Sequence, residues 1–410
     1  MDGGYGNGGG KGQAGAELGG GLCAGGTTGL VRVSGMKPTA VAVFLFFLLV
    51  YGLLNYYVGL RGFRYLSGFF PGLSGVVYWT VFWLLAGSYF GGMLLKGVLP
   101  NALGVPLTWV GSYWLAALTY LVLLLAAADP VRLALPSAER GLAVGIALLL
   151  VAILACGTWN AWHPRVSRYQ VDLPAAGPLD SLRVVLVSDV HLGSIVQLDR
   201  LERLVDQVNR LEPDLVLLAG DVADRDFDVL PREELVEGWR RLKPRLGSYA
   251  VLGNHDYYSG KVGELVADLE RGGIRVLRDQ TVKVADSFYL VGRDDPQRRS
   301  FAETGRRSLA ELLAGVEAGL PVVLLDHQPS RLEEAESLGV DLLLSGHTHR
   351  GQLFPFNLLT RRLFEVDWGY LRKGSLQVIV SCGYGTWGPP IRIGSRPEVV
   401  ELRIGFGGCY

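Results

Sequence analysis

The sequence predicts an α/β domain that follows a four-helix, all-α transmembrane region. Charge is the first indication, because residues 1–165 contain 13 of the Asp, Glu, Lys and Arg side chains, whereas residues 166–410 contain the other 65. The apolar pattern is the second, since long uncharged stretches give way to short apolar runs separated by amphipathic segments. One chain thus combines a part suited to a lipid bilayer with a part suited to water.

Residues 1–36 form a glycine-rich N-terminus, which we expect to be disordered. Fifteen of the first 35 residues are glycine, and no apolar run among them is long enough for a signal peptide. Met36 stands directly before the first apolar stretch, so a start of translation at this methionine is an alternative hypothesis.

Four uncharged stretches follow, at residues 38–60, 65–95, 97–128 and 141–164. Each exceeds the roughly 20 residues that a helix needs to cross a bilayer. The sequence therefore predicts a transmembrane domain over 37–164, with helix cores at 40–58, 76–95, 107–127 and 142–159. The alternative is a set of buried helices in a soluble protein. No ionisable side chain lies inside a predicted core, which disfavours a transporter or a proton pump and favours an anchor.

An even number of spans places the residues after 164 on the same side of the cell membrane as the N-terminus. Lys and Arg residues near the span ends are shared equally between the two sides, so charge alone does not orient the chain. The cytoplasmic side is the favoured location of residues 165–410.

Residues 165–181 are predicted as a linker, residues 182–404 as the α/β domain and residues 405–410 as a C-terminal tail. The domain has seven short runs rich in Val and Leu, typical of strands buried on both faces: 182–187, 215–219, 249–252, 288–291, 321–325, 341–344 and 376–380. Apolar residues recur at helical spacing between the first two runs. In such sheets, chemistry collects at the carboxyl ends of the strands.

Five of the six histidines follow these runs, each close to carboxylate or amide side chains. The motifs are Ser188-Asp189-Val190-His191, Gly220-Asp221-Val222-Ala223-Asp224, Gly253-Asn254-His255-Asp256, Asp326-His327-Gln328-Pro329 and Gly346-His347-Thr348-His349. Singly, each motif also fits a turn, a helix N-cap or a loop with satisfied histidines. Together they favour a site for two divalent cations, and such a pair, about 3.5 to 4 Å apart, suits the hydrolysis of a phosphate ester.

The spacing of the ligands suggests how they are arranged. Asp189-x-His191 and His347-x-His349 would each present two side chains on one side of an extended segment, so each pair is expected to converge on one centre. Oxygen and imidazole ligands without a thiolate favour Mn²⁺, Fe or Zn²⁺. The four cysteines show no CxxC spacing, so neither a disulfide framework nor a thiolate zinc site is indicated.

The ordered series DVH, GDVAD, GNHD, DHQP and GHTHRG resembles the calcineurin-like metallophosphoesterase superfamily over roughly residues 182–404. Segments 292–295, 383–392 and 396–398 resemble the branch of transmembrane proteins with a metallophosphoesterase domain, which is similar to the UDP-2,3-diacylglucosamine pyrophosphatases of lipid A biosynthesis. The resemblance implies an αββα metallophosphoesterase sandwich of two mixed β-sheets flanked by helices.

The resemblance also implies a role for each motif residue. The implied ligands are Asp189, His191 and His349 on the first metal, Asn254, His327 and His347 on the second, and Asp221 bridging both. His255 would contact the phosphate and stabilise or protonate the leaving oxygen, with Asp256 orienting it, and a bridging hydroxide would be the nucleophile. Arg350 stands where glycine is common in this branch; it could bind a second phosphate or a carboxylate of the substrate, or be solvated.

The predicted function is therefore that of a membrane-anchored dimetal phosphohydrolase acting on a phosphodiester or a pyrophosphate, with a membrane lipid as the favoured substrate class. One alternative is a catalytically inactive membrane receptor or scaffold. Another is a membrane-tethered nuclease. The 30 basic and 35 acidic residues of 166–410 give a net acidic charge, so no nucleic-acid partner is expected. The sequence gives no indication of an oligomeric state.

Overall fold

The computed structural model describes residues 38–96, 98–174, 177–300 and 305–407. These residues belong to one compact unit, Met36–Tyr410. The predicted disorder of residues 1–36 and the alternative start at Met36 concern positions outside the described residues.

Four helices in the described part are long and apolar enough to cross a membrane. They are α1 (Pro38–Phe69), α2 (Gly75–Leu94), α3 (Asn101–Ala134) and α4 (Glu139–Trp162). This confirms the predicted four-helix region, and each predicted core lies within its helix to within one residue. α1 and α3 extend furthest beyond their cores.

The extended ends of α1 and α3 carry charged side chains that pair with each other. Arg61 Nη2 lies 2.7 Å from Asp129 Oδ2, and the Tyr57 hydroxyl donates to the same carboxylate at 2.9 Å. The prediction of uncharged spans thus holds for the helix cores but not for these helix ends. Pairing between two helices lowers the cost of charges near the apolar part of a bilayer.

α2 and α3 pack closely because a glycine lies at their contact. A Cβ at Gly111 would lie 2.1 Å from the backbone nitrogen of Tyr89. Only a residue without a side chain allows the two backbones to approach this far, a common arrangement between helices in membranes.

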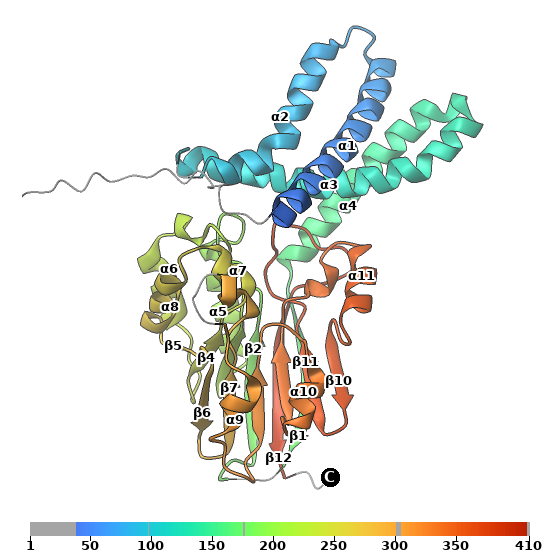
Figure 1. Cartoon of the computed structure of the whole chain (residues 1–410). Helices are drawn as coiled ribbons and strands as arrows, with labels where there is room; N and C mark the ends of the chain where they lie inside the picture. The colour runs from blue at the N-terminus through green and yellow to red at the C-terminus, as the bar shows by residue number, and fades with distance from the viewer. Residues whose placement is uncertain (1–37, 97, 175–176, 301–304, 408–410) are drawn as a thin grey trace, which may run out of the picture. The chain divides into compact units, whose positions relative to one another are not determined.

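The rest of the described chain forms two six-stranded sheets, with the orders β1-β12-β2-β3-β4-β5 and β10-β11-β9-β8-β7-β6 (Figure 1). The first sheet consists of β1 (Arg165–Leu173), β2 (Ser181–Val187), β3 (Leu215–Ala219), β4 (Ser248–Val251), β5 (Ile274–Val276) and β12 (Glu398–Phe406). The second consists of β6 (Gln280–Val284), β7 (Phe288–Gly292), β8 (Val322–Leu325), β9 (Leu342–Ser345), β10 (Gly369–Lys373) and β11 (Leu376–Val380). Both are mixed, because β12 is antiparallel to β2, and β6 and β10 are antiparallel to their neighbours.

Helices cover the outer faces of the two sheets. Those of the described domain are α5 (Leu198–Arg210), α6 (Arg232–Arg240), α7 (Asn254–Tyr258), α8 (Val262–Arg271), α9 (Leu309–Leu313), α10 (Leu332–Ser337) and α11 (Phe356–Leu363). Short 3₁₀ turns lie at Pro136–Ala138, Phe227–Val229, Pro296–Ser300 and His349–Gly351. α5, α6 and α8 share a buried apolar cluster with the first sheet, and α9 and α10 share one with the second.

The core between the two sheets follows from the alternation of side chains along the strands. In β2, Val184 and Leu186 belong to the cluster between the sheets, whereas Val185 and Val187 belong to the cluster beneath α5, α6 and α8. Both sets are fully buried, so the strand is apolar on both faces, as its continuous Val/Leu run predicts. The predicted αββα sandwich is confirmed.

The prediction of a linker over 165–181 is wrong for its first half. β1 occupies Arg165–Leu173 and pairs in parallel with β12 at the edge of the first sheet. Its outward residues are polar, and its buried apolar residues, Val171 and Leu173, lie only at its C-terminal end. The strand therefore lacks the continuous apolar run from which buried strands such as β2 and β3 are predicted. β12 continues to Phe406, two residues beyond the predicted end of the domain at 404.

Candidate metal centre

Five loops that follow strands carry the polar residues singled out from the sequence. The loops after β2, β3 and β4 belong to the first sheet, and those after β8 and β9 belong to the second. β2, β3 and β4 are parallel to one another, and β8 is parallel to β9. The carboxyl ends of these five strands lie at one edge of the sandwich. Side chains spread over 161 positions, from Asp189 to His349, can therefore meet there.

One group consists of Asp189, His191 and His349, whose ligand atoms lie within 4.8 Å of one another. His349 Nε2 is 3.3 Å from Asp189 Oδ1 and 3.0 Å from His191 Nε2. Burial, and then the neighbouring His255 imidazole, lower the pKa of His191 to about 3. Burial also lowers the pKa of His349. Both rings are therefore neutral at pH 7, which is the form that binds a metal.

A second group consists of Asp221, His327 and His347, again with ligand atoms within 4.8 Å of one another. His327 Nε2 lies 3.2 Å from Asp221 Oδ2 and 3.3 Å from His347 Nδ1. Burial lowers the pKa of His347 to about 4. The pKa of His327 is raised instead, because the carboxylate of Asp221 outweighs the effect of burial. Cation binding at His327 would thus require the loss of a proton.

Asp221 joins the two groups. Its Oδ2 lies 3.2 Å from Nε2 of His327 in the second group and 3.8 Å from Nε2 of His191 in the first. Burial would raise the pKa of this carboxyl, but the imidazoles around it hold the pKa well below its ordinary value. Asp221 is therefore an ionised carboxylate placed between two sets of ligands.

Two further observations fit a pair of cations at this place. Asn254 Oδ1 and His191 Nδ1 are buried without a hydrogen-bond partner among the described residues, which is costly for a polar atom that nothing else satisfies. Gly253 leaves room beside the ligands, because a Cβ there would lie 2.2 Å from Asp221 Oδ1 and 2.7 Å from His327 Nε2. A donor set of carboxylate, amide and imidazole suits Mn²⁺, Fe or Zn²⁺.

The backbone around the ligands differs from the extended segments that we expected. Asp189, His191, His347 and His349 all have positive φ, between 48° and 73°. Asp189 and His191 nevertheless lie in one group, as expected, whereas the expectation that His347 and His349 converge on one centre is wrong. They lie in different groups, and this division is the one that the family resemblance implies.

His255 lies beside the first group, but its carboxylate partner is not the expected one. His255 Nδ1 is 3.0 Å from Asp224 Oδ1. Asp256 instead accepts backbone N–H bonds from Gly253 and Ala223, each at 2.8 Å. Since Asp256 is the third residue of α7, its side chain turns back and caps the start of that helix. The expectation that Asp256 orients His255 is therefore wrong in this structure.

Arg350 does not take part in either group. Its guanidinium lies over the indole ring of Trp368, with Cζ 4.2 Å from the ring centre. This cation–π contact accounts for the position of the side chain. Binding of a second phosphate by Arg350 stays a prediction.

Sequence reasoning missed two residues that contact the site, Asp224 beside His255 and Arg392 beside His349. Arg392 is fully buried and donates to the carbonyl oxygens of Cys382 and Gly385 at 2.6 Å and to His349 Nδ1 at 3.0 Å. Its charge is the reason, after burial, why the pKa of His349 stays low despite the nearby Asp189. The GDVAD motif contained a signal for Asp224, whereas nothing in segment 383–392 indicated that Arg392 would be buried.

Comparison with known proteins places this chain among metallophosphoesterases. The family model for calcineurin-like phosphoesterases matches residues 182–351. A transmembrane protein with metallophosphoesterase domain from Danio rerio is 36% identical over 286 residues, which cover 65% of this chain and 65% of that protein. An uncharacterized metallophosphoesterase of Aquifex aeolicus is 35% identical over 261 residues, covering 62% of this chain and 98% of that protein.

The match to the vertebrate relatives is partial, since it spans 65% of the Danio rerio protein and 61% of the one from Bos taurus. Among solved structures, a dimetal phosphatase from Danio rerio aligns over 55% of this chain and 99% of its own, with 16% identity and a TM-score of 0.35.

Proposed function

The chain belongs to the calcineurin-like phosphoesterase family, and we propose that it is a membrane-anchored phosphohydrolase that uses two divalent cations to cleave a phosphodiester or a pyrophosphate. Four apolar helices and relatives named as transmembrane proteins suggest a membrane location. The orientation that we propose has the phosphoesterase domain on the cytoplasmic side.

The position of Asp221 carries this proposal. It is the one side chain of the two ligand groups described above whose carboxylate lies within 4 Å of imidazole nitrogens from both. A shared carboxylate holds two cations close together without adding a second negative charge. When bound, the cations would supply Lewis acidity toward a phosphoryl oxygen and would activate a water as the nucleophile.

The side chains around this centre supply the remaining steps. His255 is the group that we assign to the leaving oxygen, as a proton donor or a hydrogen-bond donor. Burial lowers the pKa of this imidazole, but the hydrogen bond and charge of Asp224 and the charge of Asp221 outweigh burial and raise it. A raised pKa increases the fraction of His255 that carries the proton to be donated.

The membrane region favours a substrate that is itself held in the bilayer. An enzyme and a substrate confined to the same surface meet by diffusion in two dimensions, and the four helices provide that confinement. We therefore propose a lipid-linked phosphoester as the substrate class.

The proposal is tested by hydrolysis of bis-p-nitrophenyl phosphate by the purified full chain with added Mn²⁺. We expect His255→Ala to retain two metals per chain and to lose roughly 10²- to 10⁴-fold in rate. Asp221→Ala should lose both metal and activity. Asp286→Asn changes an exposed carboxylate that belongs to neither ligand group and serves as the matched control. Equal rates in the wild type and both site variants would show that the assigned centre is not the catalytic one.

The same purified protein also distinguishes a phosphohydrolase from a catalytically inactive receptor or scaffold. Such a protein need not bind two cations per chain, so metal analysis of the wild type and of Asp221→Ala separates the two cases. Two bound metals without hydrolysis of diester, monoester or pyrophosphate substrates would favour the scaffold.

A further inference from the structure

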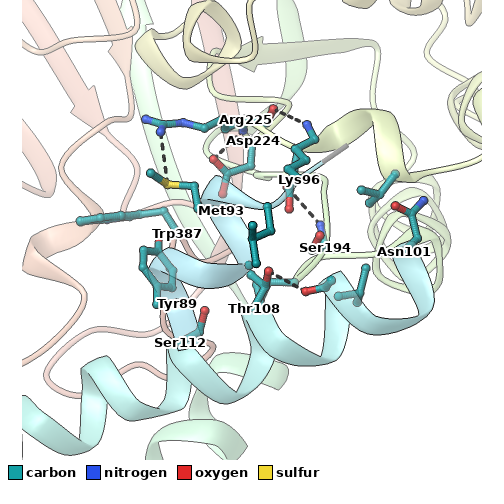
Figure 2. Close-up of a pocket in the computed structure, with 18 of the residues that line it drawn as sticks. Tyr89, Met93, Lys96, Asn101, Thr108, Ser112, Ser194, Asp224, Arg225 and Trp387 are labelled. Carbon is teal, nitrogen blue, oxygen red and sulfur yellow. Dashed lines mark hydrogen bonds between the residues drawn. The ribbon is translucent and has the colours of Figure 1, made fainter. Parts of the chain in front are cut away.

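A cavity of about 290 Å³ lies where the membrane helices meet the phosphoesterase domain. One wall is formed by the end of α2, the residues after it and the beginning of α3. The other wall is formed by the loops after β2, β3 and β4, which are three of the five loops that carry the metal-centre residues. Figure 2 shows Thr108 and Ser112 on the helix at one side and Asp224 and Arg225 on the loop that faces it.

One end of the cavity opens onto the proposed reaction site. His255 and Asp224 both line it, and so does Trp387, whose ring centre is 6.0 Å from that of His255. Lys96 and Arg225 are cationic residues of the same lining (Figure 2). A phosphate beside His255 would therefore have a direct path into this space.

The rest of the cavity is lined mostly by apolar side chains from both halves of the chain. They include Leu95, Leu99, Val105, Ile195 and Val229. Polar residues such as Asn101, Thr108 and Ser194 lie among them, and an apolar lining with interspersed polar groups is typical of sites that bind small molecules.

The cavity also extends along the membrane-spanning part of α3. Ser112 lines it and is eleven residues after Asn101, the first residue of α3, which is roughly 16 Å along the helix axis. Ser112 is completely buried, and its hydroxyl has no hydrogen-bond partner among the described residues. A buried hydroxyl is normally satisfied, so the hydroxyl of Ser112 is a polar group that the described residues leave unpaired beside this part of the cavity.

Contacts between the two halves hold the walls together. Trp109 Nε1 of α3 donates to the carbonyl of Ser194 at 2.9 Å, and Lys96 Nζ forms an ion pair with Asp228. Arg225 Nη1 lies 3.3 Å from Met93 Sδ. The cavity is thus bounded by specific contacts on both sides.

We propose that this cavity binds the apolar tail of a lipid phosphoester, with the phosphate beside His255 and the tail running along α2 and α3 past Ser112. This inference rests on the proposed function and specifies its substrate: an alkyl or prenyl chain attached directly or through a short polar linker to the phosphate that is cleaved. The membrane helices then form part of the substrate site in addition to anchoring the enzyme.

Gly104 provides a variant that fills the cavity. It lines the cavity, and a Cβ built on it meets no atom within 4 Å. Gly104→Ala and Gly104→Leu therefore place an increasing volume in the space where we position the tail. Gly87 on α2 also has nothing within 4 Å of a Cβ but does not line the cavity, so Gly87→Leu is the matched control.

The experiment measures kcat/KM of the full chain, with Mn²⁺, for p-nitrophenyl alkyl phosphates from methyl to octyl, each below its micelle concentration. For the wild type and Gly87→Leu we expect a gain of roughly two- to fourfold for each added methylene, the effect of burying that group in an apolar site. For Gly104→Leu the gain should nearly vanish, and for Gly104→Ala it should be intermediate. A gain that is equal in all four proteins, or absent in the wild type, overturns the inference.

A second measurement does not depend on turnover. An octyl phosphonate with a diazirine at the end of its chain is photo-crosslinked to the protein, and the labelled peptides are identified by mass. Labels are expected within residues 89–112 in the wild type and in Gly87→Leu and should be strongly reduced in Gly104→Leu. Labels spread over α1 and α4, unaffected by Gly104→Leu, would contradict the inference.

The two experiments separate this inference from the proposed function. Hydrolysis of bis-p-nitrophenyl phosphate without any chain-length preference would leave the phosphohydrolase intact and overturn the tail site. Specific labelling of 89–112 in a protein that hydrolyses none of the esters would support the tail site and overturn the phosphohydrolase.

Discussion

Asp224 Oδ1 lies 3.0 Å from Nδ1 of His255. A carboxylate only accepts hydrogen bonds, so Nδ1 is the donor in this pair and Nε2 is the nitrogen left for a substrate. Burial would raise the pKa of Asp224, but the hydrogen bond and charge of His255 lower it to about 2. The hydrogen bond thus orients the imidazole that we assign to the leaving group, and the carboxylate favours its protonated form.

We predict that Asp224→Asn lowers kcat by about ten- to a hundredfold while the protein keeps two metals per chain. The amide oxygen can still accept from Nδ1, but the negative charge that favours protonated His255 is lost. The effect should be strongly non-additive with that of His255→Ala, because both variants remove the same function.

Asp256→Asn is the comparison for this prediction. Asp256 accepts two buried backbone N–H bonds, and an amide can replace only one of these acceptors. We expect a loss of about 1 to 3 kcal/mol in the free energy of unfolding, seen as a lower Tm. Its effect on kcat should add to that of His255→Ala. The opposite result would be an effect of Asp224→Asn on kcat that adds to that of His255→Ala, with an effect of Asp256→Asn that does not. It would mean that Asp256, and not Asp224, is the carboxylate that assists His255.

We predict that Gly253→Ala abolishes the metal centre without unfolding the chain. The added methyl group would lie 2.2 Å from Asp221 Oδ1 and 2.7 Å from His327 Nε2, so the ligands must move apart. We expect at least about a hundredfold loss of kcat/KM, since small displacements of reacting groups have effects of this size. Metal content is measured in parallel.

Gly263→Ala is the matched control for Gly253→Ala. Gly263 lies in α8, and a Cβ there meets nothing within 4 Å. Its metal content and kcat/KM should equal those of the wild type, and its stability should change by no more than about 0.5 kcal/mol. Full activity in Gly253→Ala would mean that the site is less tightly packed than the structure shows.

Asp228 gives a prediction for the dependence of stability on pH. Burial would raise the pKa of this carboxyl, but hydrogen bonds from Lys261 and Lys96 outweigh burial and lower it. A lowered pKa in the folded state means that the ion pairs stabilise the fold above the ordinary carboxyl pKa of about 3.9, and that this contribution is lost as the pH falls through the folded value.

Asp228→Asn should therefore lower Tm at pH 7, equivalent to about 0.2 to 1 kcal/mol for these partly exposed pairs. The difference from the wild type should stay constant between pH 7 and pH 5, begin to shrink below about pH 4, and disappear only when the pH is below the lowered pKa of Asp228. Asp286→Asn, at a carboxylate whose side chain is 85% exposed, is expected to leave Tm unchanged at every pH. A difference that grows as the pH falls would contradict the assigned direction.

Removal of the metals should lower the stability of the phosphoesterase domain. Each cation that binds only the folded state, at a concentration a hundred times its Kd, contributes about 2.7 kcal/mol. We expect Tm to fall on chelation and to recover when Mn²⁺ is restored. Asp221→Ala should show no response to the chelator. The same midpoint with and without chelator in the wild type would indicate that the ligand groups do not bind cations.

Metal affinity should also fall as the pH is lowered. The pKa of His327 is raised by Asp221, so a proton occupies this ring over a wider pH range than usual and competes with the cation. Calorimetric titration in two buffers of different ionisation enthalpy should show protons released on binding.

Much of the fold could be predicted because its signals are local. The run 215–219 coincides with β3 and the run 376–380 with β11, since Val/Leu runs bounded by turn residues are typical of buried strands. β1 could not be predicted in this way. Its partner β12 is more than 220 residues away, and its stability comes from that pairing rather than from its own apolar pattern.

The sequence by itself determined the four membrane helices, the α/β domain and the identity of the side chains at the strand ends. Each of these depends on residue types and spacings within a short segment. Only the tertiary structure decided how the side chains are grouped. His347 and His349 are two residues apart and lie in different groups, and the capping of α7 draws Asp256 away from His255.

The cavity between the two halves was also decided only by the tertiary structure. Gly104 and Ser112 lie on α3, whereas Asp224 lies in a loop and His255 in α7, both more than 110 residues later in the chain. Whether such segments enclose a cavity depends on how the helices and sheets pack against one another. The spacing of residues along the sequence does not encode that packing.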